Sequence, residues 1–222
     1  IEDAGADSLA IKDMAGLLRP FDAYNLVKNL KETIEIPVHM QTHATTGMSA
    51  ATNMKAIEAG IDNIDTSISS LSMTYGHSAT ETMLAIFEDQ DREIILDLEA
   101  LEEVSKFFRN IRKKYSEFEG GLKGVDSSML VKQVPGGMLS NLESQLRANK
   151  QEDKIDLVKD EIPQVRKDFG YPPLVTPASQ IVGAQALLNV MSATRYENLS
   201  NESINLITGK YGELPGKISS EL

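Results

Sequence analysis

Two stretches of the sequence repeat one local pattern, in which an acidic helix end leads through Ala-Gly-x-Asp into an apolar run. They are residues 1–11 (IEDAGADSLAI) and 57–68 (IEAGIDNIDTSI). Glycine at that point usually ends a helix, and the following aspartate turns the chain into a strand. A third unit lies between them, because Pro20 opens a helical pattern and Ile36 leads into another apolar run. Strands that alternate with helices at this spacing predict βαβ units and a parallel sheet.

We expect three strands and three helices in this first part of the chain. The strands are predicted at about 8–12, 37–42 and 62–67, and the helices at about 20–33, 48–59 and 79–88. Three units cannot close a (β/α)8 barrel, so the pattern leaves two alternatives: a small open sheet, or the last part of a barrel whose earlier strands are missing. The chain has no initiator Met and opens on what reads as a helix end, which favours a start in the middle of a domain.

The pattern changes from Asp97 onward. Apolar residues recur at helical spacing up to Ile111, and the segment ends in Arg-Lys-Lys, which is favourable at a helix C-terminus. A Gly-rich stretch at 119–126 is the best linker candidate. Further helices are predicted near 137–149, 152–169, 178–192 and 200–207. The sequence therefore predicts an α/β domain over residues 1–94 and an all-α domain over residues 95–222.

The composition excludes several classes of partner and site. A net charge of -11 argues against nucleic acid and against anionic membrane surfaces, because both bind basic proteins. The absence of Cys excludes disulfides and thiolate metal sites and is typical of a reducing compartment. No apolar run approaches the ~18 residues needed to span a bilayer, and the opening residues do not resemble a signal peptide. We therefore expect a cytoplasmic protein that binds no nucleic acid.

The most chemically informative stretch is PVHMQTHATTG, residues 37–47. Alternate residues of a strand share a face, so His39, Gln41 and His43 are predicted to project together at the C-terminal end of a strand. Imidazole is a ligand for Zn, Mn, Fe or Co, and two such histidines make half of a metal site. The alternative is that one histidine is a satisfied core residue and the other lies in a loop.

Lys12 and Thr176 are the other two residues whose chemistry needs an explanation. A lysine that follows an apolar strand must reach solvent, bind an anion or be modified. Lys12 is therefore a candidate for a Schiff base, an anion site or a carbamate ligand, and the alternative is a lysine at the sheet rim whose ammonium group reaches water. Thr176 precedes a proline at the start of a predicted helix, where the simplest role is an N-cap. Ser179, Gln180 and His77 carry no independent signal.

Taken together, these strings resemble one family, the carboxyltransferase domain of biotin-dependent enzymes that act on pyruvate and oxaloacetate. Its members include pyruvate carboxylase and its separate B subunit, the oxaloacetate decarboxylase α subunit, and the transcarboxylase subunit that uses pyruvate. Met48 and Gln180 are more similar to the decarboxylase and two-subunit branch than to the single-chain carboxylase. The resemblance extends over nearly the whole chain, and it is carried by IKDMAGLLRP, PVHMQTHATTGM, GHSATETM, VPGGMLSNL, FGYPPLVTPASQIVGAQALLNV and ITGKYGELPG.

The family fold is a (β/α)8 barrel followed by a helical funnel. The resemblance implies that residues 1–94 supply the C-terminal three βα units, strands 6 to 8, and that residues 95–222 supply the funnel. The first five strands, the metal-binding aspartate, the substrate-binding arginine and the biotinyl domain of the family have no counterpart in this sequence. The chain is therefore expected to be an incomplete piece that exposes apolar barrel edges.

The resemblance also implies roles for individual residues. Lys12 matches the carbamylated lysine of the family, whose carbamate is a carboxylate-like metal ligand, and His43 matches the second histidine ligand. Gln41 stands where the family has its first histidine ligand, and this departure weakens the expected metal binding because an amide oxygen coordinates less strongly than imidazole. Thr176 matches the catalytic threonine. The positions that match the biotin pocket or lie near it in the funnel are Ser179, Gln180 and Gln145.

The function implied by the resemblance is carboxyl transfer between carboxybiotin and pyruvate or oxaloacetate, with biotin and a divalent metal (Zn, Mn or Co) as cofactors. Thr176 would relay the proton of the pyruvate methyl group to the ureido nitrogen of biotin, because a hydroxyl is both donor and acceptor. The implied partners are a biotin carboxyl carrier domain, a biotin carboxylase or membrane sodium-pump subunits, and a second copy of the chain in a homodimer. The alternatives are a related metal-dependent acyl-CoA lyase or synthase barrel, and an inactive piece that acts only in dimerisation.

Overall fold

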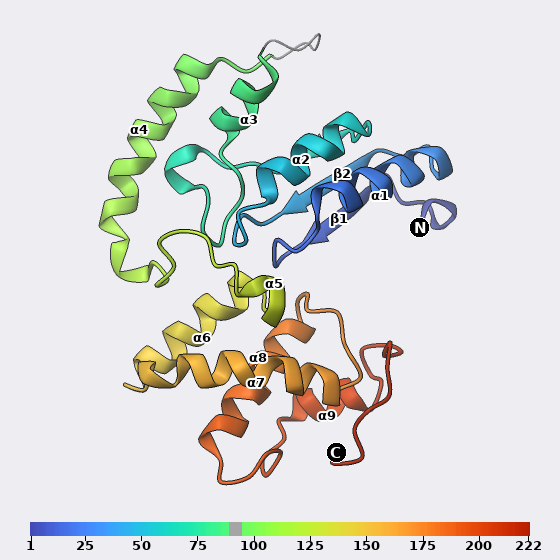
Figure 1. The fold of residues 1–222 in the computed structure, drawn as a ribbon, viewed down its shortest axis with the longest axis vertical. Helices are drawn as coiled ribbons and strands as arrows, with labels where there is room; N and C mark the ends of the chain where they lie inside the picture. The colour runs from blue at the N-terminus through green and yellow to red at the C-terminus, as the bar shows by residue number, and fades with distance from the viewer. Residues whose placement is uncertain (89–94) are drawn as a thin grey trace. The chain divides into compact units, whose positions relative to one another are not determined.

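The computed structural model of the protein describes residues 1–88 and 95–222. Contacts divide the chain into two compact units, Ile1–Ser127 and Ser128–Leu222. In Figure 1 the first unit begins in blue and continues through green, and the second ends in red. No helix within the described ranges combines the length and the apolar character needed to cross a bilayer.

The first unit contains three strands, the helices that connect them and one long helix that follows. Its strands and α-helices are β1 (Leu9–Asp13), α1 (Pro20–Thr33), β2 (Val38–Thr42), α2 (Ser49–Glu58), β3 (Asn63–Ile64), α3 (Thr80–Phe87) and α4 (Leu98–Lys114). Its short 3-10 helices are η1 (Glu2–Ala4), η2 (Ser69–Leu71) and η3 (Ser116–Phe118). The strands are all parallel and lie in the order β1-β2-β3, so each crossover contains a helix.

The ends of the first helices follow local signals in the sequence. Pro20 occupies the first turn of α1, where its missing N–H costs no hydrogen bond. Gly5 ends η1 with a φ of 83°, and Gly60 follows α2 with a φ of 92°. Both values are left-handed and disfavour a side chain. Both glycines stand where the repeated sequence pattern predicted a helix end, and a strand follows each of them.

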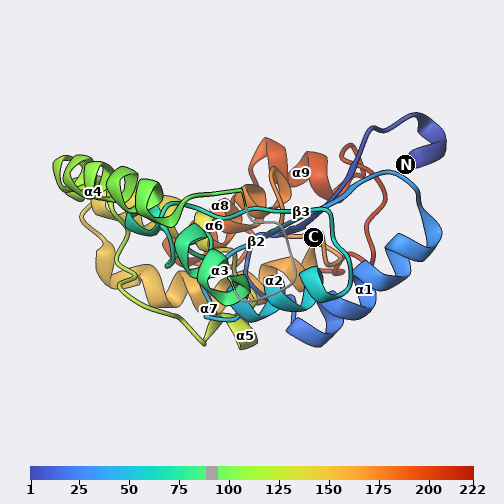
Figure 2. The same ribbon diagram turned by 90° about the horizontal axis from the view of Figure 1, so that it is seen from above.

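One face of the sheet is covered by α1 and α2, which also pack against each other (Figures 1 and 2). Val38 and Met40 of β2 are fully buried in the core cluster on this face, together with Val27 of α1. Successive strand side chains point to opposite faces. His39 and Gln41, which alternate with the buried pair, are accordingly only partly buried. The polar residues of β2 therefore lie on the face away from α1 and α2.

The long helix α4 packs against η2 and α3 and belongs to the first unit. Asp97 caps its N-terminus, because the Asp97 carboxylate accepts from the backbone N–H groups of Glu99 and Ala100 at 2.9 and 3.4 Å. The division into compact units thus places α4 in the same unit as the strands. The domain boundary predicted between residues 94 and 95 adjoins residues outside the described ranges and stays a prediction.

The described residues of the second unit form helices and the loops between them. The helices are α5 (Met129–Lys132), α6 (Gly136–Ala148), η4 (Glu152–Lys154), α7 (Ile155–Asp168), α8 (Ala178–Met191) and α9 (Asn201–Ile207). The helix α8 packs against α6, α7 and α9, and Leu139, Val165 and Val182 are fully buried between these helices. Gly183 permits the close approach of α8 to α6, since a Cβ at this position would meet Sδ of Met138 at 2.5 Å.

The predicted helices and the first two strands lie close to their predicted positions, two predicted elements differ, and the short helix α5 was not predicted. The third strand was predicted over 62–67 but is limited to Asn63–Ile64; the N–H of Asp65 still donates to the carbonyl of Met40 at 2.9 Å, and beyond it Ser67 pairs with Ala79 in an isolated bridge. The helix predicted over 152–169 is divided, with the 3-10 turn η4 preceding α7.

Candidate functional site

The carboxyl ends of β1 and β2 meet at one edge of the sheet, and three of the predicted site residues lie there. Lys12 and Gln41 are partners in the parallel register, so their side chains share a face. The N–H of His43 donates to the carbonyl of Asp13 at 3.0 Å, which continues the ladder one residue past β2. The structure therefore brings Lys12, Gln41 and His43 together at this edge.

Asp13, the next residue after Lys12, is committed to holding the loop that follows β1. One oxygen of its carboxylate accepts from the N–H of Leu17 at 2.9 Å. The other accepts from the N–H of Leu18 at 3.0 Å and from Oγ1 of Thr42 at 2.8 Å. A carboxylate with these three donors is already satisfied, so its role is to fix the loop rather than to bind a metal.

The imidazole of His43 is oriented by a backbone carbonyl. Its Nδ1 donates to the carbonyl of Tyr75 at 2.6 Å, and since a carbonyl can only accept, the lone pair of the ring is on Nε2. Burial is the main cause that lowers the pKa of His43; the hydrogen bond to Tyr75 and the charge of Asp13 oppose it, and the nearby His77 and Lys12 lower the pKa further. The ring is therefore neutral at pH 7, the form that coordinates a metal.

His77 is a residue of this edge that the sequence alone did not reveal. Its ring lies 4.8 Å from that of His43, centroid to centroid, with the planes at 67°. Its Nδ1 donates to the carbonyl of Thr42 at 3.1 Å. A signal did exist in the sequence, because the loop after the third predicted strand must return to the same edge of a parallel sheet.

His39 shares the polar face of β2 but has a partner of its own. Its Nε2 donates to Oδ1 of Asp65 at 2.7 Å. Asp65 follows β3, so this pair ties β2 to the segment after its neighbour. The interaction is structural, and it agrees with the alternative that one histidine of the stretch is already satisfied.

The donors at this edge fit a divalent metal only as a mixed set. Within residues 1–88 and 95–222, no three His, Cys, Asp or Glu side chains form a group that could hold an ion. The available donors are Nε2 of His43, the amide oxygen of Gln41 and the exposed side chain of Lys12. An ammonium group is no ligand, so Lys12 contributes only after conversion to a carbamate, which is an oxygen ligand. With that modification the residues fit a divalent cation, and His43 is the strongest ligand among them.

Thr176 lies in the second unit, just before α8, with an exposed side chain. The helix begins at Ala178, its N-cap position falls on Pro177, and no side chain caps it. The interpretation of Thr176 as an N-cap is therefore wrong, because Pro177 occupies that position and Thr176 precedes it. Within the described part of the chain the Thr176 hydroxyl has no hydrogen-bond partner, so it is accessible to a ligand.

The three other predicted residues of the second unit differ in exposure. Ser179 is 2% exposed, and its N–H donates to the carbonyl of Val175 at 2.9 Å in the first turn of α8. Gln180 is exposed. Gln145 is exposed on α6, where its Nε2 donates to Oδ1 of Asn141 at 3.3 Å. Among the described residues no hydrogen bond joins these side chains to Thr176.

A buried polar network in the second unit was not predicted. The carboxylate of Asp168, only 6% exposed, accepts from the hydroxyl of Tyr196 at 2.6 Å and from Nε2 of Gln164 at 2.8 Å. Burial, followed by this hydrogen bond to Asp168, raises the pKa of Tyr196 far above its ordinary value, so the phenol stays protonated. The network ties the end of α7 to the loop after α8. Its role is structural.

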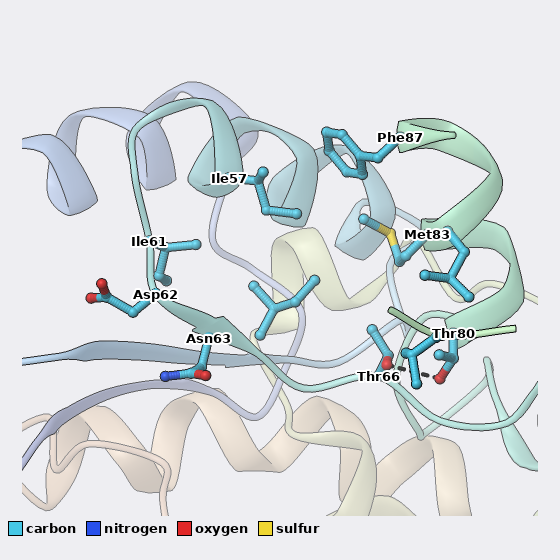
Figure 3. Close-up of a pocket in the computed structure, with 11 residues that line it drawn as sticks. Ile57, Ile61, Asp62, Asn63, Thr66, Thr80, Met83 and Phe87 are labelled. Atoms are coloured by element: carbon cyan, nitrogen blue, oxygen red, sulfur yellow. Dashed lines mark hydrogen bonds between the residues drawn. The ribbon is translucent and has the colours of Figure 1, made fainter. Parts of the chain in front are cut away.

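An apolar pocket of about 320 Å³ lies elsewhere in the first unit, between α2, β3 and α3 (Figure 3). The side chains labelled there are Ile57, Ile61, Asp62, Asn63, Thr66, Thr80, Met83 and Phe87. The carboxylate of Asp62 is engaged, because it accepts from Nζ of Lys31 and from the N–H of Val38, both at 2.7 Å. The hydroxyls of Thr66 and Thr80 are hydrogen-bonded to each other at 2.8 Å, so the pocket offers mainly apolar surface, with the Asp62 carboxylate and both hydroxyls already paired. The polar edge of the sheet is the better candidate for chemistry.

Comparison with known proteins identifies a family for each part of the chain. Residues 1–108 match the HMGL-like family, and residues 129–222 match the conserved carboxylase domain family. The pyruvate carboxylase B subunit of Methanocaldococcus jannaschii is 47% identical over 223 residues, which cover 100% of this chain and 39% of the relative. The methylmalonyl-CoA carboxyltransferase 5S subunit of Propionibacterium freudenreichii subsp. shermanii is 47% identical over 215 residues, which cover 96% of this chain and 42% of the relative.

The chain is also similar to a solved structure. The carboxyl transferase domain of Rhizobium etli pyruvate carboxylase with pyruvate and biocytin has a TM-score of 0.89 at 32% identity, over 96% of this chain and 37% of that chain. The chain thus spans about two fifths of the length of the relatives that it matches. The α/β fold class and the resemblance predicted from the sequence are confirmed: the first part of the chain matches the HMGL-like family, the second part matches the conserved carboxylase domain family, and the whole chain is similar to pyruvate carboxylase B subunits and to carboxyl transferase domains.

Proposed function

We propose that this chain provides part of an enzyme that transfers a carboxyl group between biotin and pyruvate, with oxaloacetate as the carboxylated product or substrate. The observation that carries the proposal is the similarity, over 96% of the chain, to a carboxyl transferase domain with pyruvate and biocytin. The exposure of Lys12 and Thr176 and the partial exposure of His43 support the proposal, because these groups are accessible to a ligand or a modification.

For the first unit we propose a divalent metal, Zn, Mn or Co, held by Lys12, His43 and Gln41. Lys12 would contribute a carbamate oxygen, His43 its Nε2 atom and Gln41 its amide oxygen. When bound, the metal supplies Lewis-acid polarisation of the substrate carbonyl, which makes the adjacent methyl group more acidic. The hydrogen bond from Nδ1 of His43 to the Tyr75 carbonyl keeps the coordinating nitrogen in its unprotonated form.

For the second unit we propose that Thr176 moves the proton. In the carboxylation direction the methyl carbon of pyruvate loses a proton, the ureido nitrogen of biotin gains one, and the carboxyl group passes from that nitrogen to the carbon. The Thr176 hydroxyl can accept the first proton while it donates its own, because a hydroxyl is donor and acceptor at once. Decarboxylation of oxaloacetate uses the same residue in reverse.

We assign Ser179, Gln180 and Gln145 to the recognition of biotin. Gln180 and Gln145 are exposed, and a primary amide can both donate to and accept from a ureido group. Ser179 is buried in the first turn of α8, so we infer that it orients this turn. None of the three carries a charge that would have to be removed from water when biotin binds.

We further propose that the first unit corresponds to three βα units of a (β/α)8 barrel and that the helices after it form a funnel. The parallel order β1-β2-β3 with a helix in each crossover supports this assignment. The partners would be a biotin carrier domain, with a biotin carboxylase or membrane subunits in the complete enzyme, and a second copy of the chain. An acyl-CoA lyase or synthase draws support from the HMGL-like match alone, whereas the match over residues 129–222 favours carboxyl transfer.

The test is oxaloacetate decarboxylation stimulated by free biotin, measured on the protein encoded by the complete gene and on the 222-residue chain. Biotin-dependent release of CO2 by the complete protein is expected. Absence of this activity, in a folded protein that contains metal, would contradict the proposal.

A further inference from the structure

Two of the three histidines of the chain lie together, and one of these two has no role in the proposed function. The ring centroids of His43 and His77 are 4.8 Å apart. Each ring donates through Nδ1 to a backbone carbonyl, that of Tyr75 for His43 and that of Thr42 for His77. In the neutral form of each ring, the lone pair is therefore on Nε2. Neither Nε2 atom has a hydrogen-bond partner within the residues that the structure describes.

The backbone holds the two rings in this arrangement. The N–H of Ala44 donates to the carbonyl of Gly76 at 2.8 Å, which ties the end of β2 to the loop that carries His77. The N–H of Met73 donates to the carbonyl of His77 at 2.7 Å, which closes that loop. The orienting contacts are reciprocal, because the loop supplies the carbonyl for His43 and β2 supplies the carbonyl for His77. An Nδ1–H donated to a carbonyl is the usual support for a histidine that binds metal through Nε2.

The separation of the rings suits one shared ion. With metal–nitrogen distances of about 2.1 Å and an angle near tetrahedral, two imidazoles on one ion have ring centroids roughly 5 Å apart. The measured 4.8 Å agrees with this value. The same edge lacks an imidazole at Gln41, whose side chain is the weakest donor of the proposed set.

We propose that His77 is a metal ligand of this chain, and that its Nε2 and the Nε2 of His43 bind one divalent ion of borderline softness, such as Zn²⁺ or Co²⁺. His77 would thus supply the imidazole that Gln41 does not. The inference deepens the proposed metal site and rests on the proposed function for the class of ligand. It adds a coordinating residue from a different loop.

The test is titration of the whole chain with Zn²⁺ by calorimetry and with Co²⁺ by its visible absorption, neither of which needs turnover. His77→Asn is the sharpest variant, because the asparagine amide can still donate to the Thr42 carbonyl while the Nε2 atom is lost. We expect Zn²⁺ affinity to fall at least about ten-fold and the Co²⁺ spectrum to change. His39→Asn is the matched control and leaves both unchanged, since His39 is paired with Asp65.

Two further measurements make the outcome decisive. The double variant Gln41→His with His77→Asn should regain the lost affinity, because it returns an imidazole to the edge from β2. In the unmodified chain, 15N NMR of the histidine rings should show that Zn²⁺ shifts the Nε2 signals of His43 and His77 and not those of His39, so the result does not depend on a variant that folds.

Equal Zn²⁺ affinity in His77→Asn and His39→Asn would overturn the inference and make the ring pair structural. So would a Zn²⁺-induced shift confined to His43. Tight binding that depends on His77, in a complete protein without biotin-dependent decarboxylation, would refute the proposed function and leave this inference standing.

Discussion

The two units treat their buried polar side chains differently. In the second unit most of these side chains are hydrogen-bonded to other side chains, as in the bonds of Asp168 to Tyr196 and of Gln185 to Asn189. In the first unit several buried polar atoms have no hydrogen-bond partner, and the described residues that carry them are Thr45, Asn53, Ser67 and Ser70. No buried side-chain atom of this kind occurs among the described residues of the second unit.

The first unit therefore retains buried polar groups that have no hydrogen-bond partner, and the second unit does not among its described residues. A buried group without a partner costs roughly 1–3 kcal/mol, so such groups persist where something other than stability retains them. Thr45 follows β2, and Ser67 and Ser70 follow β3, so three of the four lie in the segments that follow strands of the sheet, with Ser70 in η2. The second unit stabilises itself internally, and its accessible polar group of interest, the Thr176 hydroxyl, lies at its surface.

The largest effect is expected from Thr176→Ala. If the hydroxyl serves the reaction rather than the fold, biotin-dependent carboxyl transfer by the complete protein should fall by about 10²–10⁴-fold with an unchanged unfolding midpoint. Thr176→Ser should keep much of the activity, because it keeps the hydroxyl. Thr208→Ala is the control, since Thr208 is an exposed threonine that donates to the Ile204 carbonyl at 2.7 Å. Near-normal turnover in Thr176→Ala would refute the relay role.

Asp168→Ala, in the second unit, should produce the next largest effect, and this effect is on stability. It leaves the Tyr196 hydroxyl and the Gln164 amide without their buried acceptor, so the free energy of unfolding should fall by about 3 kcal/mol. Urea denaturation measures the change. Asp156→Ala on the same helix is the control, because that side chain is 83% exposed. Equal stability of the two variants would mean that the network contributes nothing to the fold.

The same substitution in the two units should have opposite signs. Asn53→Leu removes an amide whose oxygen and nitrogen are both buried without partners, so it should raise the free energy of unfolding by about 1 kcal/mol. Asn189→Leu should lower it by about 2 kcal/mol, because the Asn189 amide donates to Glu161 and accepts from Gln185 and Tyr196. Thermal unfolding of the pair measures both. If both variants changed the free energy of unfolding in the same direction, the two units would not differ in how they satisfy their buried polar groups.

The smallest effect is expected at the ion pair between Lys31 and Asp62. This pair is partly exposed, so it is neither a paired nor an unpaired buried group. The hydrogen bond from Lys31, helped by that from the Val38 N–H, lowers the pKa of Asp62 below its ordinary value. A depressed pKa stabilises the folded chain above the unfolded pKa of about 3.9, and this stability is lost as the pH falls through the folded value.

Asp62→Asn should therefore flatten the dependence of unfolding free energy on pH below about pH 5, by less than about 1 kcal/mol because the side chain is 36% exposed. Denaturation curves between about pH 6 and pH 3 measure this slope. High salt should shrink the difference between the variant and the unmodified chain. A variant with the original slope would exclude Asp62 as its source.

Local signals in the sequence were sufficient for much of the fold. The helix at Pro20–Thr33 was predicted at its observed bounds, because proline at its start and apolar spacing along its length are properties of adjacent residues. The helix ends at Gly5 and Gly60 could be predicted for the same reason. The third strand was overestimated, because its pairing ends when Ser67 turns to Ala79, and this contact is not encoded in the strand itself.

The site was only partly predictable, because its remaining contacts join residues that are distant in sequence. Lys12, Gln41 and His43 could be expected at one edge from the strand pattern alone. The approach of His77 to His43 depends on a loop more than thirty residues later, as the bond from His43 to Tyr75 over 32 positions illustrates. The capping role of Thr176 was wrong because Pro177, and not Thr176, occupies the N-cap position of α8, although the helix begins at the predicted residue. The Asp168–Tyr196 bond spans 28 positions and leaves no local pattern.

The three hydrogen bonds to the Asp13 carboxylate also bear on the entropy of binding at the sheet edge. They hold the peptide that follows Lys12, so the backbone of this lysine has little conformational freedom left to lose. Ordering its side chain on an ion or an anionic group then costs mainly rotation about the side-chain bonds, up to about 2 kcal/mol. An affinity measured at this edge therefore reports the chemistry of the bound group more than the ordering of the chain.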